Sequence, residues 1–264
     1  MVSSETPIDW LTSFAMTWPW RLRTERICCF RWVVSIFLFT IILDFARNCT
    51  LGFSMMNFVQ TPSMKDRVRI KKVETLSDDW YVLKKTTFDL QRSDGTWQQQ
   101  SRETYDRGNG ATILLYNLER RTVVLTRQFR FPAFMNGHSG LLIETAAGLL
   151  DKASPEERIK AEVEEETGYR VDHVRKIFEA FMSPGSVTEK LYFFLAEYDS
   201  GSRVAAGGGN FVEGEDIEVL ELSIEDAMAA IEQGNIADGK TIMLLQYAFI
   251  HVFSEAGRAI PTVC

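Results

Sequence analysis

The chain has 264 residues, 45% of them hydrophobic and 25% charged, and its net charge at pH 7 is -7. This length can hold one sizeable domain or two small ones, each with its own core. The acidic balance argues against nucleic-acid binding through a broad basic surface, and four cysteines and three histidines without metal-ligand spacing argue against a zinc site.

The first 64 residues differ in composition from the rest of the chain. They hold five arginines and four acidic residues, net +1, which leaves -8 for residues 65–264. The segment from Trp32 to Leu43 is uncharged and apolar, but its 12 residues fall short of the roughly 20 that span a membrane. A membrane anchor, a cleaved leader and upstream sequence translated from an early start remain open, and we favour the early start. A membrane partner is expected only if residues 1–64 are genuine.

Residues 65–107 carry the pattern of a small antiparallel β subdomain. Val68–Leu76, Trp80–Leu90 and Thr96–Tyr105 alternate between apolar and polar side chains as strands do. Ser93-Asp94-Gly95 separates the last two segments and is typical of a hairpin turn.

Residues 108–255 interleave strand and helix patterns, and residues 256–264 form a tail. The predicted strands are Ala111–Tyr116, Thr122–Arg127, Leu141–Glu144, Val174–Phe181 and Lys190–Tyr198. The predicted helices after them are Ile224–Gln233 and Thr241–Phe253, and the Gly-rich loop Gly201–Gly209 is predicted to be a mobile flap. The fold class is therefore α/β, with a mixed sheet.

A helix crowded with carboxylates lies between these strands. Glu162, Glu165 and Glu166 stand at i, i+3 and i+4, so all three side chains point from one face. Ile159 and Val163 supply an apolar face, four residues apart. Clustered carboxylate oxygens suit Mg2+ or Mn2+, which commonly bridge to the phosphates of a substrate. A solvated acidic face is the simpler alternative.

The ends of this helix are well defined by its sequence. Ser154 is a favourable N-cap, Pro155 suits the first helical position, and Glu157 completes a capping box. Gly168 can adopt the left-handed conformation that ends a helix. These signals predict a helix between Pro155 and Gly168.

The stretch GLLDKASPEERIKAEVEEETGY, residues 148–169, resembles the signature box of the Nudix hydrolases. Aligned from its C-terminal end, the metal-binding glutamates of that family fall on Glu162, Glu165 and Glu166. The interval from the first glycine to the last is one residue short, and the position of the early glutamate holds Ala153 or Ser154.

The arginine position of this box holds Ala161, with Lys160 next to it but about 100° further round the helix. In the family that arginine helps to orient the acidic cluster, so Ala161 bears on the rate more than on the fold. A catalytically weak protein that binds or senses a nucleotide sugar is therefore a second hypothesis, from another class.

Several other segments resemble one subgroup, the bacterial GDP-mannose pyrophosphatases, which are close relatives of the ADP-ribose pyrophosphatases. They are YDRGNGATILLYN, VVLTRQFR, MSPGSVTE, AGGG, EDIEVLEL and DGKT, in that order between Val68 and His251, about seven-tenths of the chain. The resemblance implies an α/β/α sandwich with a mixed sheet, preceded by the antiparallel β subdomain.

The resemblance also implies a reaction, the hydrolysis of the pyrophosphate bond of a nucleotide sugar. GDP-mannose, split into GMP and mannose 1-phosphate, is the expected substrate, and ADP-ribose or another nucleoside-diphosphate sugar is the alternative. The implied metal is Mg2+, with Mn2+ as a substitute, held by Glu162, Glu166, Glu215 and the main-chain carbonyl of Ala147. The implied catalytic residues are Glu166, Glu215 and Glu165. A cytoplasmic location is expected unless residues 1–64 anchor the chain.

The position of Glu215 depends on the register of its loop. Asn210-Phe211 are two extra residues relative to the subgroup pattern, and Glu213 and Asp216 lie close enough in sequence to be confused with Glu215. An exposed loop glutamate is the alternative interpretation of Glu215.

The substrate-binding residues implied by the resemblance are Tyr81, Arg102, Glu103, Arg130, Gly148, Leu149, Glu189 and Lys240. A guanidinium fork at Arg130 fits paired phosphate oxygens. Arg127 has the same chemistry three positions earlier on a strand, so it is expected to face elsewhere, in a surface ion pair. In the family the subdomain of residues 65–107 is exchanged between two protomers, so a homodimer with composite sites is expected.

Overall fold

The structure is a computed structural model that describes residues 63–254. The chain divides into two units, Met1–Pro62 and Ser63–Cys264, and all the described residues belong to the second. The apolar segment from Trp32 to Leu43 therefore lies outside the described residues. No helix in the described part is long and apolar enough to cross a membrane.

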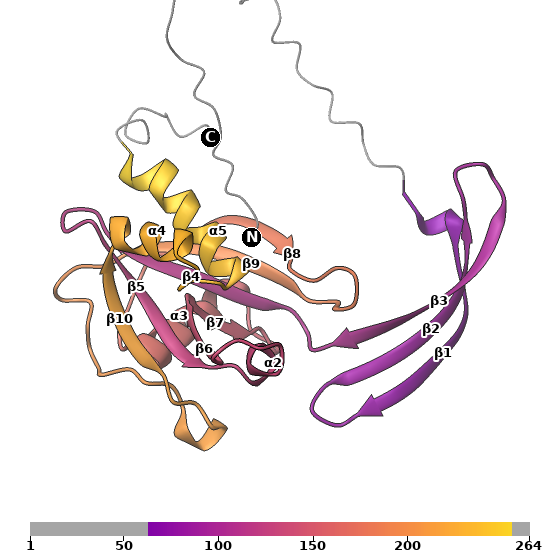
Figure 1. The fold of residues 1–264 in the computed structure, drawn as a ribbon, viewed down its shortest axis with the longest axis horizontal. Coiled ribbons are helices and arrows are strands. Elements are labelled where there is room, and N and C mark those ends of the chain that lie inside the picture. The colour runs from indigo at the N-terminus through magenta and orange to yellow at the C-terminus, as the bar shows by residue number, and fades with distance from the viewer. Residues whose placement is uncertain (1–62, 255–264) are drawn as a thin grey trace, which may run out of the picture. The chain divides into compact units, whose positions relative to one another are not determined.

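Three long strands form the first sheet, in the order β1-β2-β3 (Figure 1). A single turn of 3-10 helix at Lys65–Arg67 precedes them. The strands are β1 at Val68–Asp78, β2 at Val82–Gln91 and β3 at Trp97–Asp106, all antiparallel. The predicted antiparallel subdomain is confirmed, and the predicted turn at residues 93–95 separates β2 from β3.

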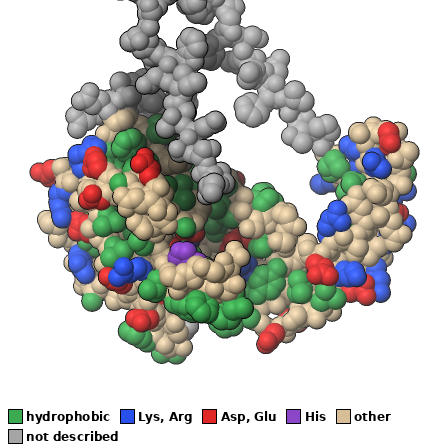
Figure 2. Space-filling model, in the orientation of Figure 1, with side chains coloured by type: hydrophobic (Ala, Val, Ile, Leu, Met, Phe, Trp, Pro, Cys, Tyr) green, Lys and Arg blue, Asp and Glu red, His purple; other side chains and the backbone are tan. Residues whose placement is uncertain are grey.

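None of the residues in these three strands is buried. Apolar side chains lie exposed among charged ones on this sheet (Figure 2), including Ile70 and Val73, whose exposed fractions are 60% and 54%. A three-stranded sheet with no covered face gains little from the hydrophobic effect. This sheet therefore lacks a core of its own within the described chain.

The second sheet is mixed, with seven strands. Its central path is β10-β5-β4-β9-β8, in which β4 and β9 are parallel and the other neighbours are antiparallel. The strands are β4 at Gly110–Asn117, β5 at Thr122–Phe129, β8 at Arg175–Phe181, β9 at Lys190–Glu197 and β10 at Glu218–Ser223. Two short strands, β6 at Leu141–Glu144 and β7 at Ala146–Leu149, pair with β5 and β4.

Helices cover both faces of this sheet, as the α/β/α prediction requires (Figure 1). The α3 helix, Pro155–Thr167, packs on one face through Ile159 and Val163, both fully buried. On the other face α4, Ile224–Glu232, and α5, Gly239–Ala248, build the larger core, and a π-helical turn at Phe249–Phe253 follows α5.

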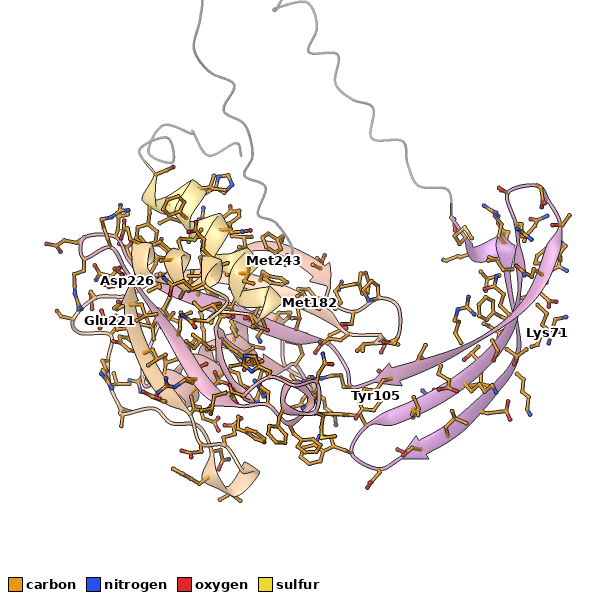
Figure 3. All side chains as sticks on the ribbon, in the orientation of Figure 1. Lys71, Tyr105, Met182, Glu221, Asp226 and Met243 are labelled. Carbon is orange, nitrogen blue, oxygen red and sulfur yellow. The ribbon has the colours of Figure 1, made fainter. Side chains whose placement is uncertain are left out.

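The larger core also takes in side chains from the ends of elements. Met182, just after β8, and Met243 on α5 both pack against it (Figure 3). The predicted helices at residues 224–233 and 241–253 are thus confirmed. The sequence interpretation missed the short helix α2, Phe131–Met135, and the strands β7 and β10.

The predicted caps of α3 are present. The side chain of Ser154 accepts the N–H of Glu157, the Glu157 carboxylate accepts the N–H of Ser154 in return, and Gly168 ends the helix with φ of 75°. The loop of residues 201–209 is bonded to this end of the helix: the N–H of Gly208 donates to the carbonyl of Glu166 at 2.9 Å. Main-chain hydrogen bonds therefore hold this loop against the end of α3, and its predicted mobility stays a prediction.

Hydrogen bonds join the end of β3 to the loop before β9. The N–H of Tyr105 donates to the carbonyl of Ser186 at 2.8 Å, and the N–H of Thr188 donates to the carbonyl of Tyr105 at 3.1 Å. The Thr188 hydroxyl also bonds Asp106 at 3.0 Å. This junction fixes the β1–β2 turn near the larger sheet.

Candidate active site

A cavity of about 590 Å³ lies where β7, α3 and the loop before β10 meet. It gathers nearly all of the residues predicted for the site: Tyr81, Arg130, Ala147, Gly148, Leu149, Glu162, Glu165, Glu166, Glu189, Glu215 and Lys240. Residues separated by more than a hundred positions therefore line one space. Its volume is within the range of small-molecule sites.

Two predicted substrate residues, Arg102 and Glu103, do not line this cavity. Both are exposed on β3, and Arg102 bonds the carbonyl of Ser101 at 2.8 Å and the side chain of Gln100 at 3.0 Å. Within one chain, then, the structure does not bring these two residues to the site. Their predicted role requires a second protomer.

The acidic face of α3 is not a solvated charge run. Glu162 and Glu166 are buried, with exposed fractions of 6% and 2%, while Glu165 is exposed at the edge of the cavity. Burial raises the pKa of Glu166 well above its usual range, and the nearby carboxylates of Glu162 and Glu215 raise it further. Arg130 and a backbone hydrogen bond from Ala147 oppose this shift. Such an arrangement is costly unless a cation or a proton compensates it.

Gly148 allows β7 to pass close to Glu162. A Cβ atom at this position would lie 1.8 Å from Oε1 of Glu162, far inside contact distance. The carboxylate therefore rests against a bare stretch of backbone. A side chain at this position would displace the Glu162 carboxylate, which is a physical reason for the glycine that opens the box.

Arg158 is a residue that the sequence interpretation missed. It stands four residues before Glu162 on α3, and its Nη2 lies 2.5 Å from Oε1 of that carboxylate. Its Nε is buried and makes no hydrogen bond in the described part of the chain. On α3 itself, the guanidinium beside the acidic cluster is that of Arg158, which lies about one turn before Ala161. Lys160 does not line the cavity. The i, i+4 spacing within EERIKAE could have identified it.

Glu215 faces the cavity from the loop before β10. Its Oε2 accepts the N–H of Asn210 at 2.9 Å, and its charge contributes to the raised pKa of Glu166. Asp216 also lines the cavity but is more exposed. The interpretation of Glu215 as an idle exposed loop residue is therefore wrong, since its side chain is half-buried.

Two cations reach the cavity from opposite elements and share one carboxylate. Glu144 at the end of β6 accepts Nε of Arg130 on Oε2 at 2.7 Å and Nζ of Lys240 on Oε1 at 2.6 Å. Lys240 also lies 3.0 Å from Asp238. Arg127, by contrast, forms an exposed ion pair with Glu218, as predicted for a residue that faces elsewhere.

Aromatic and charged groups line the cavity beside the β1–β2 turn. The rings of Trp80 and Tyr81 pack edge to face, with their centroids 6.3 Å apart. The guanidinium of Arg107 lies over the Tyr81 ring. Arg107 also pairs with Glu189 at 3.4 Å. Of these four residues, the family resemblance predicted only Tyr81 and Glu189 as substrate-binding residues. Trp80, which is 80% exposed, offers an aromatic surface at the cavity.

The chemistry of these donors fits a hard divalent cation. Glu162 and Glu166 provide carboxylate oxygens one helical turn apart, and Oε2 of Glu166 is buried without a hydrogen-bond partner in residues 63–254. No three carboxylate, imidazole or thiol groups in that range already enclose a metal position. The donors are therefore of a chemical kind that would hold such a cation.

Comparisons with known proteins agree with this fold and identify the family. A protein-family model for the GDP-mannose pyrophosphatase NudK N-terminal domain matches residues 67–105. A GDP-mannose pyrophosphatase of Pectobacterium atrosepticum is 57% identical over 195 residues, 74% of this chain and 100% of the relative. One from Citrobacter koseri is 55% identical over 185 residues, 70% of this chain and 96% of the relative.

Among solved structures, an ADP compounds hydrolase matches with a TM-score of 0.53 and 17% identity over 72% of this chain and 96% of that one. This likeness supports the fold. The relatives, together with this fold and the acidic box at residues 148–169, identify the chain as a Nudix hydrolase. Within that class the chain belongs to the NudK-like family of GDP-mannose pyrophosphatases.

Proposed function

We propose that this protein hydrolyses GDP-mannose to GMP and mannose 1-phosphate. The observation that carries the proposal is the cavity in which the buried glutamates of α3 meet the cations Arg130 and Lys240. The names of relatives that are 55% to 57% identical support the choice of substrate. Water adds to one of the two phosphorus atoms, the bond to the bridging oxygen breaks, and the departing phosphate takes a proton.

The carboxylates of the cavity have two roles in this proposal. Glu162, Glu166 and Glu215, with the main-chain carbonyl of Ala147, hold the cation. Glu215 or Glu166 accepts a proton from the attacking water, and Glu165, at the exposed edge, orients that water. A divalent cation, Mg2+ with Mn2+ as a substitute, would neutralise the diphosphate oxygens and lower the pKa of a bound water.

The remaining lining residues bind the substrate. Arg130 and Lys240 hold phosphate oxygens, since both are cations that line the cavity. Gly148 and Leu149 present backbone to the diphosphate, and Tyr81 and Glu189 contact the nucleoside or the sugar. The aromatic surface beside Tyr81 is suited to a nucleobase.

We further propose a homodimer in which the β1–β3 sheet is exchanged. Two features support it: no residue of these strands is buried, and Arg102 and Glu103 lie away from the cavity of their own chain. The partner's sheet would then carry these two side chains to each site. The same exchange would cover the exposed apolar residues.

The test offers the purified chain with Mg2+ equal concentrations of GDP-mannose, ADP-mannose, ADP-ribose and GDP-glucose, and follows monophosphate release. We expect clear preference for GDP-mannose. Preference for ADP-ribose would keep the chemistry and change the substrate. Binding of GDP-mannose without turnover would instead identify a sensor and overturn the enzymatic proposal.

A further inference from the structure

The carboxylates near the cavity fall into two groups with different partners. The carboxylates of Glu162 and Glu215 raise the pKa of the buried Glu166, and Oε2 of Glu166 is left without a hydrogen bond in the described chain. Glu144 is different, because each of its oxygens already accepts a hydrogen bond from a cation, Arg130 or Lys240. Its side chain is only 4% exposed.

Arg130 and Lys240 keep N–H groups that Glu144 does not use, and these could bind a ligand. Glu144 takes Nε of Arg130, and the two terminal nitrogens of that guanidinium make no hydrogen bond within residues 63–254. Lys240 donates to Glu144 at 2.6 Å and forms an ion pair with Asp238 at 3.0 Å, and its ammonium carries three N–H groups. The pair therefore keeps a guanidinium fork and ammonium hydrogen, a donor set that matches adjacent phosphate groups.

A rigid frame holds the carboxylate between them. The main chain of Glu144 is paired with Thr126 on β5, and the hydroxyl of Thr126 donates to its carbonyl at 3.3 Å. The next N–H, of Thr145, donates to the hydroxyl of Thr241 at 2.7 Å, and that hydroxyl donates to Asp238 at 2.6 Å. The start of α5, which carries Lys240, is thus fastened to the end of β6.

We propose that Glu144 is a positioning residue that holds Arg130 and Lys240 as one clamp for the diphosphate and does not bind the metal. This inference rests on the proposed function, because it assigns the two cations to phosphate oxygens. The clamp brings together the end of β5 and the start of α5, which are far apart in sequence. A substrate diphosphate would then meet two cations at a fixed separation instead of two independent side chains.

The test compares Glu144→Gln with the parent in the full chain. Glutamine keeps one acceptor oxygen but turns an NH2 group toward one of the two cations, so that contact is lost. We expect KM for GDP-mannose with Mg2+ to rise about tenfold, as for loss of a charge-assisted hydrogen bond, with kcat within about threefold. Affinity for inorganic pyrophosphate, titrated in the presence of EDTA, should fall by a similar factor. Affinity for Mn2+ should stay within about twofold of the parent value.

Two matched variants complete the experiment. Glu218→Gln removes a carboxylate from the exposed ion pair with Arg127, outside the cavity, and should leave KM, kcat and pyrophosphate affinity unchanged. Glu144→Asp keeps the charge but is one methylene too short to reach both cations, so it should show an intermediate loss. It also serves if Glu144→Gln does not fold.

The opposite results are equally specific. A fall in Mn2+ affinity with pyrophosphate affinity kept would make Glu144 a metal ligand, and a rise in pyrophosphate affinity would make it a competitor for the cations. If neither the Mn2+ affinity nor the pyrophosphate affinity changed, Glu144 would be a purely structural residue. A parent protein that binds no pyrophosphate would also overturn the clamp. A parent that binds pyrophosphate in a Glu144-dependent way but hydrolyses no nucleotide sugar would refute the proposed function and keep the clamp.

Discussion

Glu166 combines burial, like-charged neighbours and an oxygen without a hydrogen bond in the described chain. A buried charge without a compensating partner destabilises the fold, so a residue with a purely structural role would be better served by an apolar side chain here. Residues with strongly perturbed pKa values cluster at functional sites. At the scale of a single residue, the burial of Glu166 therefore costs stability, and a bound cation would compensate that cost.

The Glu166→Gln variant should abolish turnover. It should also stabilise the metal-free protein by about 1–2 kcal/mol at pH 8, because glutamine has nearly the same shape as glutamate but carries no charge. The raised pKa means that the folded chain keeps a proton that the unfolded chain releases. Stability without metal should thus fall as the pH rises from the unfolded pKa, 4.5, through the folded one, and the variant should lose this dependence. Thermal unfolding in EDTA across pH measures it.

A control for this prediction is Glu164→Gln on the same helix. Glu164 is paired with Arg170 outside the cavity, so turnover should persist and the metal-free protein should gain no stability. Adding Mg2+ should raise the melting temperature of the parent and of this control, but much less that of Glu166→Gln. Equal gains in all three would argue against Glu166 as a metal ligand.

Arg158 acts as the counter-ion of Glu162 when no metal is bound. We expect Arg158→Gln to destabilise the metal-free protein by about 1 kcal/mol, a modest value because the side chain is one-third exposed. Mg2+ should restore most of that loss, since the cation then compensates Glu162. Melting temperatures with and without Mg2+ give the comparison, with Lys160→Gln as control. The same loss in both conditions would show that Arg158 contributes packing only.

At the scale of elements, the C-terminal turn of α3 helps to position the carboxylates of the acidic cluster. Gly168 has a φ of 75°, and a Cβ there would lie 2.3 Å from the carbonyl oxygen of Ala205. The loop of residues 201–209 bonds this end of the helix and leads on to Glu215. The left-handed turn thus couples the helix and loop that supply the acidic cluster.

Gly168→Ala should therefore destabilise the protein by about 2 kcal/mol or more, through the left-handed backbone and the clash together. Gly185→Ala is the matched control, because Gly185 has ordinary backbone and open space around it, and it should change stability by less than about 0.5 kcal/mol. Urea unfolding of both variants measures the difference. Equal effects would mean that the turn tolerates a side chain.

The whole molecule combines a well-packed mixed sheet with a three-stranded sheet that has no buried residue. The pairing register places Val73, Thr86 and Arg102 side by side across one face of the small sheet. Ile70 is opposite Phe88 on that same face. This face carries both exposed apolar residues and a predicted substrate residue, as an exchanged subdomain requires.

Val73→Lys should accordingly weaken the dimer, because it buries a charge in the proposed contact. Light scattering after size exclusion should show a dimer for the parent and a larger share of monomer for the variant, with turnover falling in parallel. Ser77→Lys places the same charge on the opposite face, since its partner Leu83 alternates with Thr86 on β2, and should stay dimeric. A monomeric, active parent would rule out the exchange.

The local patterns of this chain determined the elements, because each depends on neighbours within a few residues. Alternation predicted β1–β3, and the capping residues predicted the span of α3. The spacing of Glu162, Glu165 and Glu166 predicted one acidic face, and family resemblance supplied most of the residues that line the cavity.

Only the tertiary structure decided which of these side chains are buried and which share a partner. The burial of Glu166, the pairing of Arg158 with Glu162 and the bridge from Arg130 through Glu144 to Lys240 join elements that no short pattern relates. The mixed sheet brings β5, β6 and the start of α5 together, so a contact across 96 residues depends on packing and not on sequence spacing. Periodicity predicts which face of an element is apolar, and packing decides what that face meets.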